Sequence, residues 1–118
     1  MMDTAAMLAW FKTLSESEKI LFLLDMMFEF TIVIRSVFHD GDKERSLAAA
    51  YSLSEFNHRL TSKVSAMLEN KATYPDDMVI GGFVHRFSQP ELRAEAFIWD
   101  RLVQRANYRR SASQRPVG

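Results

Sequence analysis

The segment from Ile20 to Phe38 most constrains the fold of this chain, because it is apolar around most of a helix. Residues in an α-helix are spaced about 100° apart, so Asp25 and Glu29 fall on one narrow polar stripe of this segment. An ordinary surface helix needs an apolar face only a little over 100° wide, and this segment is apolar over roughly twice that arc. We therefore expect it to be the central helix of the fold, or part of a subunit interface.

The same segment is a poor membrane span, because Asp25, Glu29 and Arg35 lie inside it. Charged groups near the middle of a lone span cost several kcal/mol. The 118 residues contain no cysteine, which excludes disulfides, thiolate metal sites and a cysteine nucleophile. The start of the sequence lacks the basic region of a secretory signal. We expect a cytoplasmic protein without membrane contact.

Turn and capping residues predict an all-α chain of five helices. Ser15 and Glu18 form a capping box that opens the apolar helix, and His39-Asp40-Gly41-Asp42 is expected to end it. A second capping box, at Ser88-Gln89-Pro90-Glu91, is expected to open the last helix. The five expected helices run from Met2 to Leu14, from Ser15 to about Phe38, from Lys43 to Asn70, from Pro75 to Phe87, and from Ser88 to about Arg110.

These helices predict a single domain over residues 1–110, built as a compact five-helix bundle around the hydrophobic second helix, with a flexible tail at 111–118. On the second helix we expect Phe28→Ala or Phe30→Ala to destabilise the fold by roughly 3–5 kcal/mol if the ring is buried, and a change well under about 1 kcal/mol at both would contradict the central placement. Four partner helices, two of them short, can cover much of such a helix but leave part of it open, and large exposed apolar patches are unusual in monomers. We therefore expect a homodimer built partly on this helix; the alternative is a monomer whose central helix is fully enclosed.

Asp25 and Glu29 are the most informative carboxylates, because they lie one turn apart on a mostly apolar helix. Two acids so placed can raise each other's pKa or bind a cation. They can equally pair with an arginine from a neighbouring helix or form the solvated edge of their own helix, and we favour these last interpretations.

Other patterns that suggest chemistry are each incomplete. Glu55 and His58 match half of a di-metal carboxylate motif, but helical spacing turns them away from the apolar face, and a Glu55–Arg59 pair is the simpler interpretation. His39-Asp40 lacks the further histidines that a metal-dependent phosphohydrolase needs, and His85 stands alone. No Gly-x-Ser-x-Gly element is present. We predict no catalytic residue, no metal ligand and no cofactor.

The last helix carries a ridge of arginines, although Lys and Arg together balance Asp and Glu over the whole chain. Arg101, Arg105 and Arg109 are spaced by four residues, and guanidinium groups next to aromatic rings suit phosphates and acidic protein surfaces. The candidate partner-binding residues are Arg93, Phe97, Arg101, Arg105, Tyr108 and Arg109. The opposite, core-facing side of this helix consists of Trp99, Leu102, Val103 and Ala106.

The apolar excess and the arginine ridge together predict a protein–protein interaction or regulatory module without catalytic activity, dimeric and able to bind an acidic protein. A nucleic-acid-binding protein that uses the ridge is one alternative. The ridge lies late in its helix, whereas DNA-recognition helices read bases from their N-terminal part, which makes this alternative weaker. A helical bundle that binds a metal or a small ligand is the other alternative.

Overall fold

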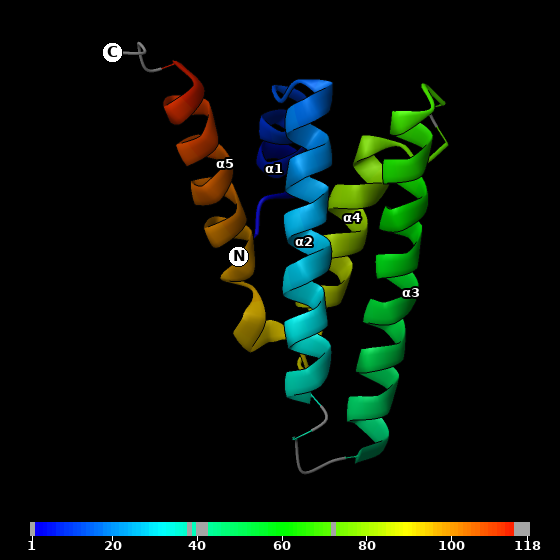
Figure 1. Cartoon of the computed structure of the whole chain (residues 1–118). Coiled ribbons are helices and arrows are strands. Elements are labelled where there is room, and N and C mark those ends of the chain that lie inside the picture. The colour runs from blue at the N-terminus through cyan, green and yellow to red at the C-terminus, as the bar shows by residue number, and fades with distance from the viewer. Residues whose placement is uncertain (1, 38, 40–42, 72, 115–118) are drawn as a thin grey trace.

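The computed structural model describes residues 2–37, 39, 43–71 and 73–114, and within these ranges the chain is all-α. The expected five-helix fold is confirmed, with a short 3₁₀ helix added before the last helix (Figure 1). The helices are α1 (Thr4–Lys12), α2 (Glu16–Val37), α3 (Lys43–Leu68), α4 (Asp76–Phe87) and α5 (Ile98–Gln114), and the 3₁₀ helix is η1 (Arg93–Glu95).

The capping box at the start of α2 forms as the sequence predicts. The backbone N–H of Ser15 donates to Glu18 Oε1 at 2.7 Å, and the backbone N–H of Glu18 donates to Ser15 Oγ at 3.2 Å. At its C-terminal end, α3 stops at a residue in the left-handed conformation, Asn70, with a φ of 61°. The N–H of Lys71 then reaches back to the carbonyl of Ala66 at 2.6 Å, which is the closing bond of a Schellman motif.

The last helix differs from the prediction at both ends. Ser88 ends α4 instead of opening α5, because its backbone N–H donates to the carbonyl of Val84 at 3.0 Å. The chain then passes through turns and η1, so that α5 begins only at Ile98 and continues through 111–114, which we had placed in the tail. The remaining tail residues 115–118, together with Phe38 and the predicted stop at residues 40–42, lie outside the described residues.

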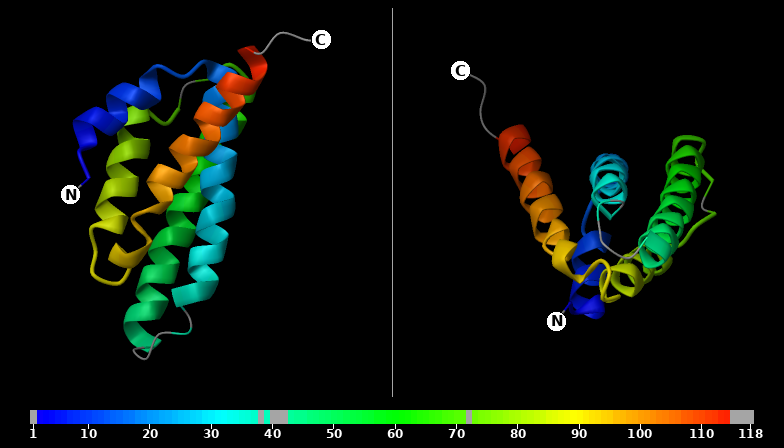
Figure 2. Two further views of the ribbon diagram at one scale, coloured as in Figure 1. Left: turned by 90° about the vertical axis from the view of Figure 1, so that its left-hand side faces the viewer. Right: turned by 90° about the horizontal axis from the view of Figure 1, so that it is seen from below.

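The second helix occupies the middle of the molecule, as its composition predicts. In Figure 1, α5 and α3 flank α2 on either side, and α1 and α4 lie behind it. Seen from below in Figure 2 (right), α3 and α5 form two arms with α2 between them. In the described part of the chain, no helix covers the side of α2 that faces the viewer in Figure 1. We call the surface of α2 and α3 on that side the front face.

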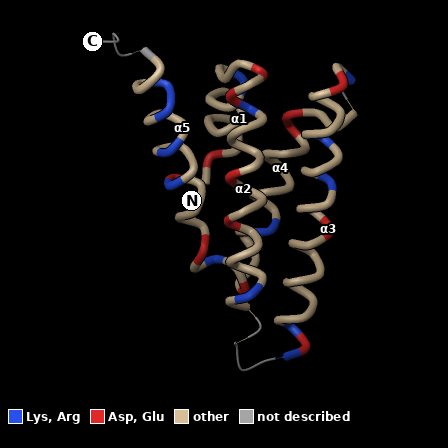
Figure 3. The backbone as a smooth tube through the Cα atoms, viewed as in Figure 1, with Lys and Arg blue, Asp and Glu red and all other residues tan. Residues whose placement is uncertain are grey.

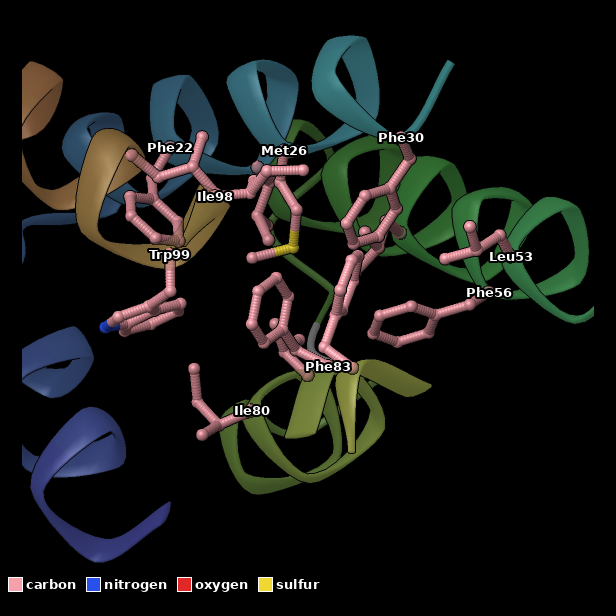
Figure 4. Close-up of a cluster of buried hydrophobic side chains, with 14 of the residues drawn as sticks. Phe22, Met26, Phe30, Leu53, Phe56, Ile80, Phe83, Ile98 and Trp99 are labelled. Atoms are coloured by element: carbon pink, nitrogen blue, oxygen red, sulfur yellow. The ribbon is translucent and has the colours of Figure 1, made fainter. Parts of the chain in front are cut away.

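Aromatic rings from α1 to α5 form a cluster behind α2, part of which Figure 4 shows. Phe30 of α2 packs against Phe83 and Phe87 of α4, with ring centroids 6.0 and 5.5 Å apart. Closer to the start of α2, Phe22 lies 5.2 Å from Trp99 of α5. A contact of 5.4 Å between Phe83 and Trp99 joins the two groups. Aromatic pairs at these separations add to the stability that burial alone provides.

The two phenylalanines singled out on α2 have opposite environments. Phe30 is fully buried, whereas Phe28 is 65 % exposed, so only Phe30 meets the condition for a large loss of stability on substitution by alanine. The physical reason is that α1 and α4 both pack behind α2, which leaves no helix for the front.

None of the helices in the described ranges is long and apolar enough to cross a membrane.

Gly82 lets α4 approach α3 closely. A Cβ at this position would lie 2.6 Å from Cε1 of Phe56, a ring that is fully buried and held by Phe30 at 5.8 Å and by the Arg86 guanidinium at 4.4 Å. At the preceding position, Gly81, a Cβ would have nothing within 4 Å.

The two adjacent glycines therefore form a matched pair for mutation. We expect Gly82→Ala to lower the free energy of unfolding by about 1–3 kcal/mol, because the trapped ring has to shift. Gly81→Ala should raise it by about 0.5–1 kcal/mol, because alanine favours the helix. Chemical denaturation of both variants tests this, and equal effects at the two positions would contradict the close approach.

Candidate interaction surface

The front side of α2 carries a continuous apolar stripe, which we call the α2 stripe: Leu21, Leu24, Phe28 and Ile32. These side chains are 44, 45, 65 and 47 % exposed, respectively. Their spacing of three, four and four residues keeps them on one side of the helix. Large apolar side chains that are half exposed in a row are characteristic of a surface that meets another protein.

A second set of exposed residues runs along α3 at the same kind of spacing. This α3 edge consists of Leu47, Tyr51, Ser54, His58, Thr61 and Ser65. Thr61 Oγ1 lies 3.9 Å from Met27 Sδ, and Asn57 Nδ2 lies 3.5 Å from the carbonyl oxygen of Met27, so the α3 edge runs beside α2. Neither the α2 stripe nor the α3 edge contains Asp, Glu, Lys or Arg. The repeat of three and four residues is the one by which antiparallel helices pack in bundles.

Along its other side, α2 is joined to α5 by an ionic network. Glu29 is only 3 % exposed and accepts hydrogen bonds from Arg101 and, at 3.1 Å, from Arg105. Asp25 accepts from Arg109 and lies 3.4 Å from Arg105. Figure 3 shows these acidic positions of α2 next to the basic positions of α5. The predicted pairing of Asp25 and Glu29 with arginines of a neighbouring helix is therefore what forms.

A further ion pair, between Arg110 and Glu18 at 2.7 Å, extends this network to the start of α2. The hydrogen bond from the Ser15 backbone lowers the pKa of Glu18, and Arg110 lowers it further. The hydrogen bond to Glu29 raises the pKa of Arg105. These two shifts favour the charged forms of Glu18 and Arg105, and the ion pairs of the network fix α5 along α2.

The six candidate partner-binding residues separate into two places. Arg101, Arg105 and Arg109 face the carboxylates of their own chain, and Tyr108, on the same helix, is exposed. Phe97 lies under the guanidinium of Arg101 at 5.1 Å. Phe97 also lines a cleft together with Arg93, so it borders both places. The core-facing side of α5 is confirmed for Trp99, Leu102 and Ala106, which are buried.

Sequence reasoning missed a second ionic cluster, at the junction of α2, α3 and α4. Lys63 is 7 % exposed and donates to the carbonyl of Tyr74 at 2.6 Å and to Asp76 Oδ1 at 2.9 Å. Lys19 donates to Asp76 Oδ2 at 2.8 Å. The only available signal was the position of Lys63, three residues after the buried Leu60 on the apolar side of α3. The cluster ties the loop after α3 to α2.

The remaining candidate residues have ordinary surroundings. Glu55 pairs with Arg59 at 2.7 Å on the surface of α3, which confirms the simpler interpretation of that motif. His39, His58 and His85 are exposed. Across the described ranges, no group of three or more His, Asp or Glu side chains could hold a metal ion.

The described residues thus form an all-α fold that leaves an apolar face exposed on α2 and α3. Comparison with protein-family models, with curated proteins and with solved structures finds no match to this chain. The function is therefore inferred from the surfaces of the chain itself.

The buried carboxylate of the ionic network is open to a direct test. Glu29→Gln should lower the free energy of unfolding by about 2 kcal/mol, because hydrogen bonds to a charged group are lost and two guanidinium groups lose their counter-charge. The same substitution at the exposed pair, Glu55→Gln, should cost less than about 0.5 kcal/mol. Urea denaturation of both variants measures the difference, and equal losses would show that the network adds no stability.

The cluster around Asp76 predicts a contribution to acid sensitivity. Burial opposes ionisation of Asp76, but hydrogen bonds from Lys19 and Lys63 outweigh it and lower the pKa of Asp76 below its ordinary value of 3.8. A carboxylate with a lowered folded-state pKa stabilises the protein above pH 4, and this stabilisation is lost as the pH falls through the folded-state value.

We therefore expect Asp76→Asn to be less stable than the parent chain at pH 7, with the difference shrinking as the pH falls below about 4. Thermal unfolding at a series of pH values measures it. Asp77→Asn, at the next and exposed position, is the control. A difference between the Asp76 variant and the parent that stays constant from pH 7 to pH 3 would contradict the assignment.

Proposed function

We propose that this chain is a protein–protein interaction module without catalytic activity, and that its partner at the front face is a second copy of itself. The observation that carries the proposal is the α2 stripe, four large apolar side chains left half exposed on the helix that forms the centre of the fold. Covering such a stripe removes apolar area from water, which is the main driving force of association.

The size of the front face suits a dimer. A helix of 22 residues such as α2 is about 33 Å long, and two neighbouring helices present a width of about 20 Å. The resulting face of about 650 Å² approaches the roughly 800 Å² that each partner buries in a standard interface. Tyr51 and Leu47, which are 73 and 58 % exposed, add apolar area beside the C-terminal end of α2.

The charge distribution favours a second copy over a charged partner. In a two-fold dimer each surface meets itself, so a face with like charges would repel its copy. The α2 stripe and the α3 edge have no Asp, Glu, Lys or Arg, and the exposed Arg35 lies on the same side of α2 only in its last turn. The whole chain has a formal net charge of zero. Two copies in an antiparallel arrangement would place stripe against stripe and edge against edge, forming a four-helix bundle from two α2–α3 hairpins.

The arginine ridge supports a nucleic acid or an acidic protein as partner less well than the α2 stripe supports a second copy. A nucleic acid or an acidic protein would have to compete with Asp25 and Glu29 for Arg101, Arg105 and Arg109. An acidic partner at the ridge and a cytoplasmic location, which the cysteine-free sequence favours, remain predictions that accompany this proposal.

Light scattering over a range of protein concentrations tests the dimer. We expect the parent chain to approach twice its monomer mass of 13.6 kDa, and Phe28→Ser to remain near the monomer mass. Because Phe28 is exposed, the variant should keep its helical circular dichroism. Met78→Ser is the matched control, since Met78 is also half exposed but lies on α4, behind α2.

A parent chain that stays monomeric at every soluble concentration would overturn the proposal. The same holds for a Phe28→Ser variant that dimerises as strongly as the parent, or for a Met78→Ser variant that loses the dimer. Salt should change the association little, because no charged pair is expected at the centre of the interface.

A further inference from the structure

The α3 edge contains one side chain that changes its charge near neutral pH, His58. This residue is exposed, and helical spacing keeps it in line with Ser54 and Thr61 of the same edge. The α2 stripe and the rest of the α3 edge contain no Asp, Glu, Lys or Arg. Because histidine gains a positive charge between about pH 8 and pH 5, acidification charges the front face at this position.

His58 lies near the middle of the front face along the helix axes. Asn57 Nδ2 lies 3.5 Å from the carbonyl oxygen of Met27, and Thr61 Oγ1 lies 3.9 Å from Met27 Sδ, so His58 is level with Met27. Met27 is midway along α2 (Glu16–Val37), and Figure 1 shows α2 and α3 side by side over this length.

This central position brings two histidines together in the proposed dimer, on which the inference rests. When two antiparallel copies overlap along the whole of α2, the two-fold axis passes at the level of Met27, and each residue at that level meets its own copy. Edge against edge therefore places His58 next to His58 of the partner subunit. Two neutral imidazoles can pack there or share a hydrogen bond, whereas two imidazolium groups repel each other.

The carboxylate nearest to His58 on its own helix already has a counter-charge. Glu55 lies one turn before His58 and pairs with Arg59 at 2.7 Å. Within the described ranges, no carboxylate forms an ion pair with the His58 imidazole. A proton on His58 therefore adds a charge that its own helix does not neutralise.

The helices packed against α3 supply no counter-charge either. On α2, the carboxylates Asp25 and Glu29 are held by arginines of α5, and the charged residue on the front side is Arg35, about two turns beyond Phe28. On the other side, α4 packs against Phe56, which points about 200° away from His58 around α3. The titratable groups of α4 therefore do not face His58.

We infer that self-association at the front face is controlled by pH through His58, so that two copies associate when the imidazole is neutral and separate when it is protonated. Moving an imidazolium from water into an apolar interface costs free energy, and the partner copy adds repulsion between like charges. Protons therefore bind the separate chains more readily than the dimer, and acidification shifts the equilibrium towards the monomer.

Sedimentation equilibrium at about pH 8 and about pH 5.5 tests this inference, because histidine titrates between these values whereas most Asp and Glu side chains stay ionised. We expect the dissociation constant of the parent dimer to rise about tenfold on acidification. His58→Gln, which is polar but does not titrate, should have the same dissociation constant at both values. His58→Lys, which is cationic at both, should associate weakly at both. Since His58 is exposed, both variants should keep their helical circular dichroism.

His85→Gln is the matched control, since His85 is also exposed but lies on α4, behind α2. It should respond to pH as the parent does. A parent dimer that is equally tight or tighter in acid, or a His58→Gln variant that still dissociates in acid, would overturn the inference and leave the proposed dimer standing. A parent chain that is monomeric at about pH 8 would remove both.

Discussion

The packing of aromatic rings behind α2 is the interaction on which the rest of the structure depends. Phe22 and Phe30 point from α2 into the same layer, where they meet rings from α4 and α5. This layer takes up one side of α2, and α3 takes up the next. Because the short helices α1 and α4 are both needed to complete the aromatic layer, the described chain has no element left for the front face.

The side of α2 next to α5 and the side on the front face differ in what their side chains need. Beside α5, carboxylates that would be costly to bury alone are satisfied by guanidinium groups of the same chain. On the front, the α2 stripe consists of apolar side chains, and the cost is exposed apolar area. The first arrangement is complete within one chain, whereas the second leaves that area exposed in a single chain. The self-association proposed here would cover it.

Much of the fold can be predicted from local sequence signals. The features that cannot be predicted depend on how helices distant in the sequence pack against one another. The capping box at Ser15 and the core-facing side of α5 were predictable because neighbouring residues determine them. Helical periodicity also showed that α2 is apolar nearly all round, but it cannot say which arc its neighbours cover, and so it did not separate the buried Phe30 from the exposed Phe28. The burial of Lys63 depends on Asp76 in a later helix. The Ser88 capping pattern was overridden because the same residue closes α4.

The ionic network also determines the axial position of α5. Apolar contacts such as those of Leu102 and Ala106 are non-directional, so they would tolerate a small slide of one helix along the other. Glu29 receives guanidinium groups from two successive turns of α5, and Asp25 does the same one turn further along. A displacement by a single residue would put Leu102 and Ala106, or Asp100 and Gln104, opposite Glu29 in place of its two arginines. The hydrophobic core alone would accept several registers of α5 along α2. The carboxylates on the polar stripe of α2 select one of them.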